Sequence, residues 1–425
     1  MVPAPLTNIA VVVVGEPRVF VSLVVIALIA VLSPMIVDLK PSLRIPAVVV
    51  EVVLGCAAGP FGFNLISPNV ATDVLSFLGL GYLLFIAGLE LNPVEIRTHA
   101  GTVITDYAIS AVLGIGAAYL IARIEPISHP LLLGFALTST SLGVLVPILR
   151  DAHENQTQFG QMAVAHASMG EFGSLILVAV FFSSEDSEPG VRIGLFVAFA
   201  ILLVVADLVM ARAIRSSRLF DIGRRLRGGS WQLDVRLAIL ILIGFAAIAD
   251  LFGFDAILGC FAAGAIIKVI DRRGFAGDHD LVIKLDAVGY GFLIPVFFIS
   301  SGINLNLRRL IEQPRHFLLI PAILVALLVA RGLPALRHRR EIGTDRAVAL
   351  GLLLSSTLTV LVVVVSIATD LHILDEAAAA ALLASGLLSE LLFPPVARWL
   401  LERAGDQLDV VTNQPAGSPP PSGGG

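Results

Sequence analysis

The chain has 425 residues, of which 57% are hydrophobic and only 14% are charged, whereas a soluble domain has about 25% charged residues. This composition excludes an ordinary soluble fold and predicts a polytopic membrane protein. Its two cysteines, Cys56 and Cys260, lie in apolar segments and indicate neither a disulfide nor a redox site. No segment suggests nucleic-acid binding, and no nucleophile–base or metal-ligand cluster suggests an enzyme, a cofactor or a resident metal.

The apolar stretches, taken in chain order, predict an all-α fold of about 13 transmembrane helices, since a span needs about 20 mostly apolar residues. Residues 1–18 form an N-terminal segment without the basic start of a cleavable signal. The expected spans are 19–39, 45–66, 74–91, 100–124, 130–150, 160–184, 191–212, 232–251, 255–270, 286–305, 316–336, 345–369 and 376–401. The membrane domain then covers 19–403, and the polar residues 404–425 predict a disordered tail.

Basic residues predict the orientation of these spans. If the N-terminus lies outside, most Lys and Arg residues fall in inside loops, above all in the loop 212–236. Because basic residues favour the cytoplasmic side, we expect an inner (plasma) membrane protein with its N-terminus outside and its C-terminus in the cytoplasm. The lipid bilayer is then its immediate partner.

Three sequence patterns occur twice in the same order, about half the chain apart. Val53–Gly59 resembles Ile257–Gly264, and Leu84–Leu91 resembles Phe297–Leu305. The apolar stretches 134–147 and 351–364 are each interrupted by three hydroxyl residues, Thr138-Ser139-Thr140 and Ser355-Ser356-Thr357. The copies are an odd number of helices apart, so the repeats, about 45–184 and 255–401, have opposite orientations. Inverted repeats are typical of secondary transporters with an ion site at the repeat interface.

Glu171 is the strongest candidate for chemistry, because it lies near the middle of the sixth span, where an ionisable residue is costly and usually functional. A carboxylate there can hold a small cation through its oxygens or carry a proton. One group that does either, but not both at once, is sufficient for cation/proton exchange. A structural alternative is a protonated side chain bonded to a nearby carbonyl.

The hydroxyl residues supply further candidate oxygen ligands. Thr138, Ser139, Ser355 and Ser356 lie where the fifth and twelfth spans are expected to unwind, and Ser168 shares a helix face with Glu171. Ordinary interhelical hydrogen bonding is the alternative role. His166 points away from the face of Glu171 and is interpreted as a packing or hydrogen-bonding residue.

Two more charges lie within predicted spans. Arg331 lies deep in the eleventh span and needs a partner or a route to the interface. Glu390 occupies the second repeat's counterpart of Glu171. We therefore expect Arg331 and Glu390 to form an intramembrane charge pair, which leaves Glu171 available.

Several of these motifs resemble a known family. Glu51–Gly62, Leu83–Leu91, Phe159-Gly160-Gln161 and Pro295–Gly302 are similar to segments of the monovalent cation:proton antiporter-2 superfamily, which includes Kef-type and sodium/hydrogen exchanger domains. The resemblance covers about residues 20–400. It implies 13 helices in two inverted repeats, with crossed, discontinuous helices at the fifth and twelfth spans. It also implies a core domain that moves against a dimerisation domain, and hence a homodimer.

The chain departs from this family at its acidic signature. In that family two adjacent polar or acidic residues are usual in the sixth span. In this chain the corresponding positions hold Gly170 and Glu171, so the acid is kept and its polar neighbour is missing. In relatives with two acids the first is thought to pair with a basic residue that matches Arg331. Because Gly170 cannot form that pair, the resemblance implies electroneutral exchange.

We therefore expect an antiporter that exchanges Na⁺ or K⁺ for H⁺ by alternating access. One alternative is an inverted-repeat transporter of a small organic anion, bound at half-helix N-termini. Another is a regulatory membrane protein without transport, which predicts folding and dimerisation but no coupled flux.

Overall fold

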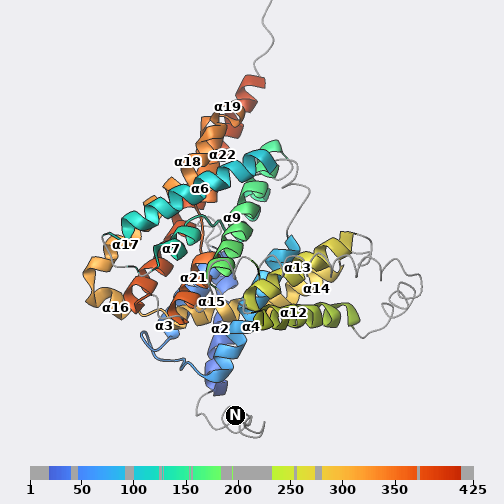
Figure 1. Cartoon of the computed structure of the whole chain (residues 1–425), viewed down its shortest axis with the longest axis vertical. Coiled ribbons are helices and arrows are strands. Elements are labelled where there is room, and N and C mark those ends of the chain that lie inside the picture. The colour runs from blue at the N-terminus through green and yellow to red at the C-terminus, as the bar shows by residue number, and fades with distance from the viewer. Residues whose placement is uncertain are drawn as a thin grey trace, which may run out of the picture.

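A computed structural model describes residues 19–39, 46–90, 100–123, 127, 129–152, 154, 157–182, 194, 232–252, 256–272, 280–370 and 374–412. All regular elements in these ranges are helical, as Figure 1 shows. Seven continuous helical stretches among the described residues are long and apolar enough to cross a membrane, and two shorter apolar helices accompany them. The prediction of an all-α polytopic membrane protein is confirmed.

The N-terminal half follows the predicted spans, with the expected break in the fifth span, but the second span ends early. Its helices are α2 (Val19–Leu39), α3 (Ala47–Ala58), α4 (Val70–Glu90), α6 (Ala100–Ile121), α7 (Pro130–Ala136), α8 (Leu142–Asp151) and α9 (Gln158–Phe182). Helix α3 stops before Gly59 and Pro60, and a turn closes when the Phe63 amide donates to the Ala57 carbonyl at 2.7 Å. The predicted span 191–212 lies outside the described residues, apart from residue 194.

The C-terminal half begins with α12 (Leu233–Leu251), α13 (Ala256–Arg272), α14 (Asp280–Val288), η1 (Gly289–Leu293), α15 (Ile294–Ile303) and α16 (Leu307–Glu312). It continues through η2 (Pro314–Leu318), α17 (Leu319–Leu327), η3 (Leu328–Gly332), α18 (Leu333–Ala335), η4 (Leu336–His338), α19 (Arg339–Ile342), α20 (Thr344–Leu354), α21 (Thr359–Asp370) and α22 (Glu376–Thr412). Helix α22 continues to Thr412, past residue 404, where the disordered tail is expected to begin. Residues 413–425 lie outside the description.

Glycines let helices of one repeat pack closely against helices of the other. A Cβ on Gly55 of α3 would clash with the Ile299 carbonyl of α15, and a Cβ on Gly302 of α15 would clash with α3 in return. Helices α4 and α13 repeat this reciprocal contact through Gly88 and Gly264. Such close backbone approach is how membrane helices associate without a hydrophobic driving force between them. These paired contacts agree with the repeated sequence patterns.

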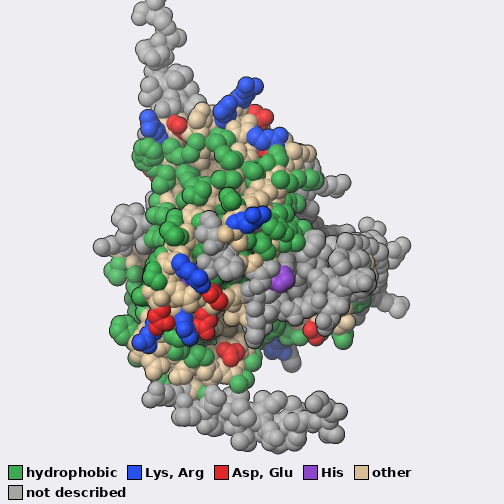
Figure 2. Space-filling model, turned by 60° about the vertical axis from the view of Figure 1, so that its left-hand side comes forward, with side chains coloured by type: hydrophobic (Ala, Val, Ile, Leu, Met, Phe, Trp, Pro, Cys, Tyr) green, Lys and Arg blue, Asp and Glu red, His purple; other side chains and the backbone are tan. Residues whose placement is uncertain are grey.

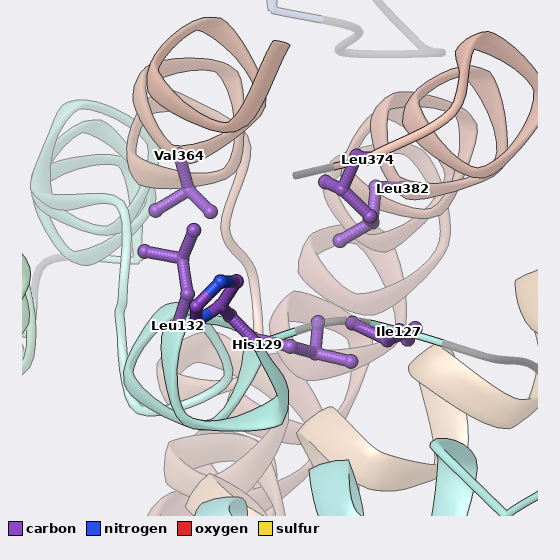
Figure 3. A pocket seen from close by; sticks show the side chains of 7 residues that line it. Ile127, His129, Leu132, Val364, Leu374 and Leu382 are labelled. Atoms are coloured by element: carbon purple, nitrogen blue, oxygen red, sulfur yellow. The ribbon is translucent and has the colours of Figure 1, made fainter. Parts of the chain in front are cut away.

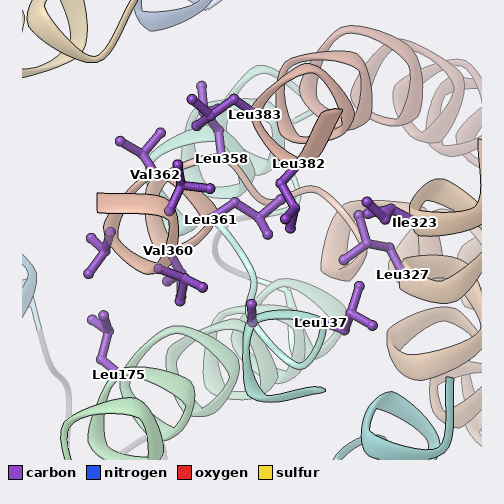
Figure 4. Packing of buried hydrophobic residues seen from close by; sticks show 14 of the residues in the cluster. Leu137, Leu175, Ile323, Leu327, Leu358, Val360, Leu361, Val362, Leu382 and Leu383 are labelled. Carbon is purple, nitrogen blue, oxygen red and sulfur yellow. The ribbon is translucent and has the colours of Figure 1, made fainter. Parts of the chain in front are cut away.

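The largest apolar cluster surrounds the two interrupted spans. Figure 4 shows side chains of α9, α17, α21 and α22 meeting there with Leu137, which follows α7; among them are Leu175, Leu327, Leu361 and Leu382. On the outer face in Figure 2, hydrophobic side chains predominate and the charged ones gather mainly towards the two ends. The crossing of the interrupted spans therefore lies in an apolar interior, where any polar group needs an internal partner.

Candidate functional site

The fifth and twelfth spans are both broken at their hydroxyl triplets. Helix α7 ends at Ala136 and α8 begins at Leu142, while α20 ends at Leu354 and α21 begins at Thr359. The intervening residues are almost completely buried, with exposed fractions of 4% or less. The prediction of crossed discontinuous helices is confirmed, because these two segments bond directly to one another.

Three hydrogen bonds join the unwound segments. The Ser141 amide donates to the Ser356 carbonyl at 2.8 Å, and the Thr140 hydroxyl donates to the Leu354 carbonyl at 2.6 Å. The hydroxyls of Ser139 and Thr357 are also 2.6 Å apart. Backbone groups freed by the two breaks are thus satisfied across the crossing rather than by water. The hydroxyl triplets carry out the structural role that their residue types predict.

Glu171 lies at the start of the half-helix α8. Its side chain, on α9, is 6% exposed, and its Oε2 accepts a hydrogen bond from the Leu142 amide at 2.9 Å. Leu142 is the first residue of α8, so the carboxylate meets the positive end of that helix dipole. This contact places Glu171 at the helix crossing.

Glu390 has a corresponding place in the second repeat. It lies on α22 with 2% exposure, and its carboxylate lies beside the Ser141 side chain and the Leu358 backbone. Leu358 directly precedes α21. Its Oε2 has no hydrogen-bond partner among the residues that the structure describes. Two buried carboxylates therefore lie at the start of the two half-helices, beside the adjacent residues Ser141 and Leu142.

Arg331 bonds to the first unwound segment, and the structure does not bring it together with Glu390. The guanidinium is 3% exposed and lies in the π-helical turn η3. Its Nε and Nη2 donate to the Thr140 hydroxyl at 3.0 and 2.8 Å, and Nη2 also donates to the His166 carbonyl at 2.9 Å. Within the described ranges no carboxylate lies in ion-pair distance of Arg331. The expected charge pair is replaced by neutral oxygen partners.

Gly170 accounts for the position of the guanidinium. A Cβ on Gly170 would clash with Arg331 Nη2 and would lie 2.9 Å from Thr140 Oγ1. The missing side chain thus makes the room that Arg331 occupies. This geometry explains in physical terms why Gly precedes Glu171 in this sequence.

The remaining predicted ligands are buried close to the crossing, but most of their hydroxyl protons are already used. Thr138 donates to the Phe135 carbonyl at 2.7 Å, Ser139 to the Ala136 carbonyl at 2.6 Å, and Ser355 to the Gly351 carbonyl at 2.7 Å. Ser356 has a longer contact of 3.5 Å with the Leu352 carbonyl, and Ser168 is 3% exposed on α9. Oxygen lone pairs remain the groups with which these side chains can hold a cation.

The sequence analysis missed three residues that surround His166. Its Nε2 lies 3.1 Å from Asp106 Oδ2, and the same oxygen lies 2.6 Å from Nε2 of His338. Arg337 Nη1 contacts the other carboxylate oxygen, Oδ1. These positions lie far apart in the sequence, so no local spacing reveals them. Ser141, the Glu390 partner next to the first triplet, was also overlooked.

An apolar cavity lies away from this polar crossing. Figure 3 shows it between α7, α21 and α22, with Leu132, Val364 and Leu382 on its walls and His129 at one side. Neither Glu171 nor the hydroxyl triplets line it. The cavity therefore offers no ligand set for a small cation.

Comparisons with known proteins agree with this architecture. Residues 24–403 match the sequence model of the family described as sodium/hydrogen exchanger, transmembrane. The putative Na⁺/H⁺ antiporter YjbQ of Bacillus subtilis (strain 168) is 27% identical over 398 residues, which cover 90% of this chain and 63% of that protein. The glutathione-regulated potassium-efflux system protein KefC of Salmonella paratyphi B is 26% identical over 328 residues, which cover 72% of this chain and 50% of that protein.

The chain thus spans between half and about two thirds of the length of these two relatives. Among solved structures, its fold is similar to that of the sodium proton antiporter MjNhaP1 from Methanocaldococcus jannaschii, with a TM-score of 0.62 and 16% identity. That similarity covers 91% of this chain and 99% of the other. At this level of identity the likeness concerns the fold.

Proposed function

The chain belongs to the transmembrane sodium/hydrogen exchanger family, and from that premise we propose that it exchanges a monovalent cation, Na⁺ or K⁺, for H⁺ across a membrane. The observation that carries the proposal is the position of Glu171. Its carboxylate is buried inside a transmembrane helix and accepts the first amide of a half-helix at the crossing. The relatives named antiporters support the same class of transport.

In this mechanism Glu171 binds the cation and the proton in turn. The α8 N-terminus favours the carboxylate form, which then needs a cation or a proton to balance its charge in the apolar interior. Because both compete for the same oxygens, loading of one requires release of the other. This competition couples the two fluxes without any covalent step.

Hydroxyl oxygens are proposed to complete the coordination of the cation. Ser168 lies one helical turn before Glu171, and Thr138, Ser139, Ser355 and Ser356 lie on the unwound segments. Both Na⁺ and K⁺ prefer such hard oxygen ligands, so the choice between them depends on the geometry of the loaded site. Arg331 stays bonded to Thr140 and holds a fixed positive charge next to Gly170.

Electroneutral exchange follows from a single titrating carboxylate. Gly170 contributes no second acid, and Glu390 is proposed to keep one protonation state beside Ser141 and Leu358. One cation then crosses for each proton. Arg331 and Glu390, expected from the sequence to pair, are instead proposed to act separately.

Alternating access is proposed to come from movement of the helices around the crossing against the remaining helices, as in other inverted-repeat transporters. We further propose a homodimer in the plasma membrane, with the N-terminus outside and the C-terminus in the cytoplasm. The distribution of Lys and Arg among the loops supports this orientation.

Proton flux in proteoliposomes tests the proposal. An imposed pH gradient, followed with a pH-sensitive dye, is challenged with Na⁺, K⁺ or Li⁺ for the wild type, for Glu171→Gln and for the control Glu51→Gln, a second buried carboxylate outside the crossing. We expect cation-dependent collapse of the gradient in the wild type and the control, and its loss in Glu171→Gln. Collapse that persists in Glu171→Gln moves the site elsewhere, and no response in folded wild-type protein refutes the antiporter.

A further inference from the structure

Three residues of metal-binding types, one aspartate and two histidines, converge beneath the surface, at least one helical turn from the proposed ion site. Asp106 on α6, His166 on α9 and His338 on η4 are 3%, 4% and 5% exposed. Their potential ligand atoms, one carboxylate oxygen and two imidazole nitrogens, all lie within 4.8 Å of one another. Three separate elements bring them together, so the cluster depends on the complete fold.

The hydrogen-bond partners of His166 show that the cluster needs positive charge at its centre. Nδ1 lies 2.9 Å from the Met162 carbonyl, which can only accept, so Nδ1 carries a proton. A neutral ring then has its lone pair on Nε2, which faces Asp106 Oδ2 at 3.1 Å. Two acceptors at this distance repel unless a proton or a metal ion lies between them. Nε2 of His338 lies 2.6 Å from the same Asp106 oxygen.

We propose that Asp106, His166 and His338 bind a divalent transition-metal ion of the zinc type. Two imidazoles and one carboxylate are ligands that Zn²⁺ accepts at about 2.0–2.2 Å, which places tetrahedral ligand atoms about 3.3 Å apart. The Nε2–Oδ2 separations of 3.1 and 2.6 Å would then have to lengthen by about 0.2 and about 0.7 Å. Three protein ligands leave the fourth position to water.

The groups around the cluster support metal binding. In metal sites the second ring nitrogen of a histidine usually donates to a carbonyl or a carboxylate, which fixes the orientation of the ring. The Met162 carbonyl takes this place for His166, at 2.9 Å from Nδ1. Both Nε2 atoms therefore point towards the same oxygen before any ion arrives.

Arg337 lies between this site and the surface of the protein. Its guanidinium contacts Asp106 Oδ1, but its own side chain is 51% exposed, so it can turn outwards without disturbing the interior. While it covers Asp106, its positive charge opposes a second cation in the cluster. Removal of that charge is expected to strengthen metal binding, an effect that loss of folding cannot imitate.

A bound dication would also affect the proposed exchange site. His166 precedes Glu171 by five residues on α9, a rise of about 7.5 Å along the helix axis. Its carbonyl accepts a bond from Arg331, which holds the unwound segment through Thr140. Two added positive charges at this distance disfavour a cation at Glu171. This consequence rests on the proposed function, whereas metal binding itself does not.

Zn²⁺ titration of the purified full-length protein in detergent, with a chromophoric chelator as competitor, tests the site. We expect one Zn²⁺ per wild-type chain and binding at least tenfold weaker in Asp106→Asn and His338→Gln. His129→Gln, a histidine beside the apolar cavity, is the matched control and should bind as the wild type. Arg337→Gln should bind more tightly than the wild type.

The site is refuted if the wild type binds no stoichiometric Zn²⁺, or if the two ligand variants bind as well as the control. It is also refuted if Arg337→Gln gains no affinity, because the guanidinium then does not oppose the metal. Should Asp106→Asn fail to fold, His338→Gln and Arg337→Gln still decide the matter. In proteoliposomes, micromolar Zn²⁺ should raise the cation concentration for half-maximal exchange several-fold in the wild type but not in His338→Gln. Cation exchange that Zn²⁺ does not affect would refute the effect of the metal on exchange and leave the proposed function standing. Zn²⁺ binding in a protein that shows no exchange would refute the proposed function and leave the metal site standing.

Discussion

Replacement of Thr140 by Val is expected to destabilise the protein far more than the same change at its repeat counterpart, Thr357. The Thr140 hydroxyl uses its whole bonding capacity, because it donates to the Leu354 carbonyl and accepts from Nε and Nη2 of Arg331. The Thr357 hydroxyl makes one neutral bond, to Ser139. Valine has nearly the same shape as threonine, so the comparison isolates the hydroxyl oxygen.

The expected magnitude follows from these partners. A hydrogen bond to a charged group contributes about 1.5–3 kcal/mol and a neutral one about 1 kcal/mol. Loss of the Thr140 hydroxyl removes two charged bonds and leaves the buried Arg331 with fewer acceptors, at a cost of about 3–6 kcal/mol in the free energy of unfolding. Loss of the Thr357 hydroxyl should cost about 1 kcal/mol.

Thermal unfolding of the two purified variants in the same detergent, followed by the fraction of monodisperse protein, measures this difference. Thr140→Val should lose its folded state at a clearly lower temperature than Thr357→Val, which should lie close to the wild type. Equal losses, or a larger loss for Thr357→Val, would show that the Arg331 contact does not stabilise the crossing and that the reasoning is wrong.

Two further predictions concern the neighbourhood of the crossing. Gly170→Ala should destabilise the protein by about 1–3 kcal/mol, because the new Cβ displaces Arg331. Gly116→Ala on α6 is the control, because a Cβ there meets no other atom, and it should stabilise the protein by at most about 1 kcal/mol. Thermal unfolding of both variants checks this, and equal behaviour would contradict it. Glu390→Gln should retain cation-dependent proton flux, because the amide oxygen can still accept from Ser141, while Glu390→Leu should lose about 1–3 kcal/mol of stability. Loss of flux in folded Glu390→Gln would instead make Glu390 a second carrier.

The sequence alone predicted the parts of the site that depend on periodicity and residue type. Hydroxyl triplets in apolar spans indicated where the helices break, and the mid-span position of Glu171 indicated a buried carboxylate, which the structure places at a half-helix N-terminus. These features follow from local rules, since hydroxyls satisfy freed backbone groups and carboxylates are costly in an apolar interior.

The expected ion pair between Arg331 and Glu390 is not formed, and local sequence rules could not have shown this. The π-helical turn η3 changes the direction in which Arg331 leaves its helix, and no sequence pattern in 328–332 announces that turn. The side chain reaches Thr140, which lies 191 positions away. The Asp106 cluster was missed for a similar reason, because His338 is 232 positions from Asp106 and the contact exists only after the helices pack.

The two halves of the crossing have the same broken-helix backbone but differ in charge. This difference favours ion binding at one of the two buried carboxylates. Each half-helix begins beside a buried glutamate, yet the cationic side chain bonds only to the first unwound segment, through Thr140. Beside Glu171, the helix N-terminus and the Arg331 charge next to Gly170 favour the anion that, in the proposed mechanism, binds the cation. Glu390 has its helix N-terminus and the Ser141 hydroxyl, but Arg331 is bonded elsewhere. A neutral Glu390 can still accept hydrogen bonds at its position. The two repeats can therefore share one fold although only one of their two buried carboxylates exchanges ions.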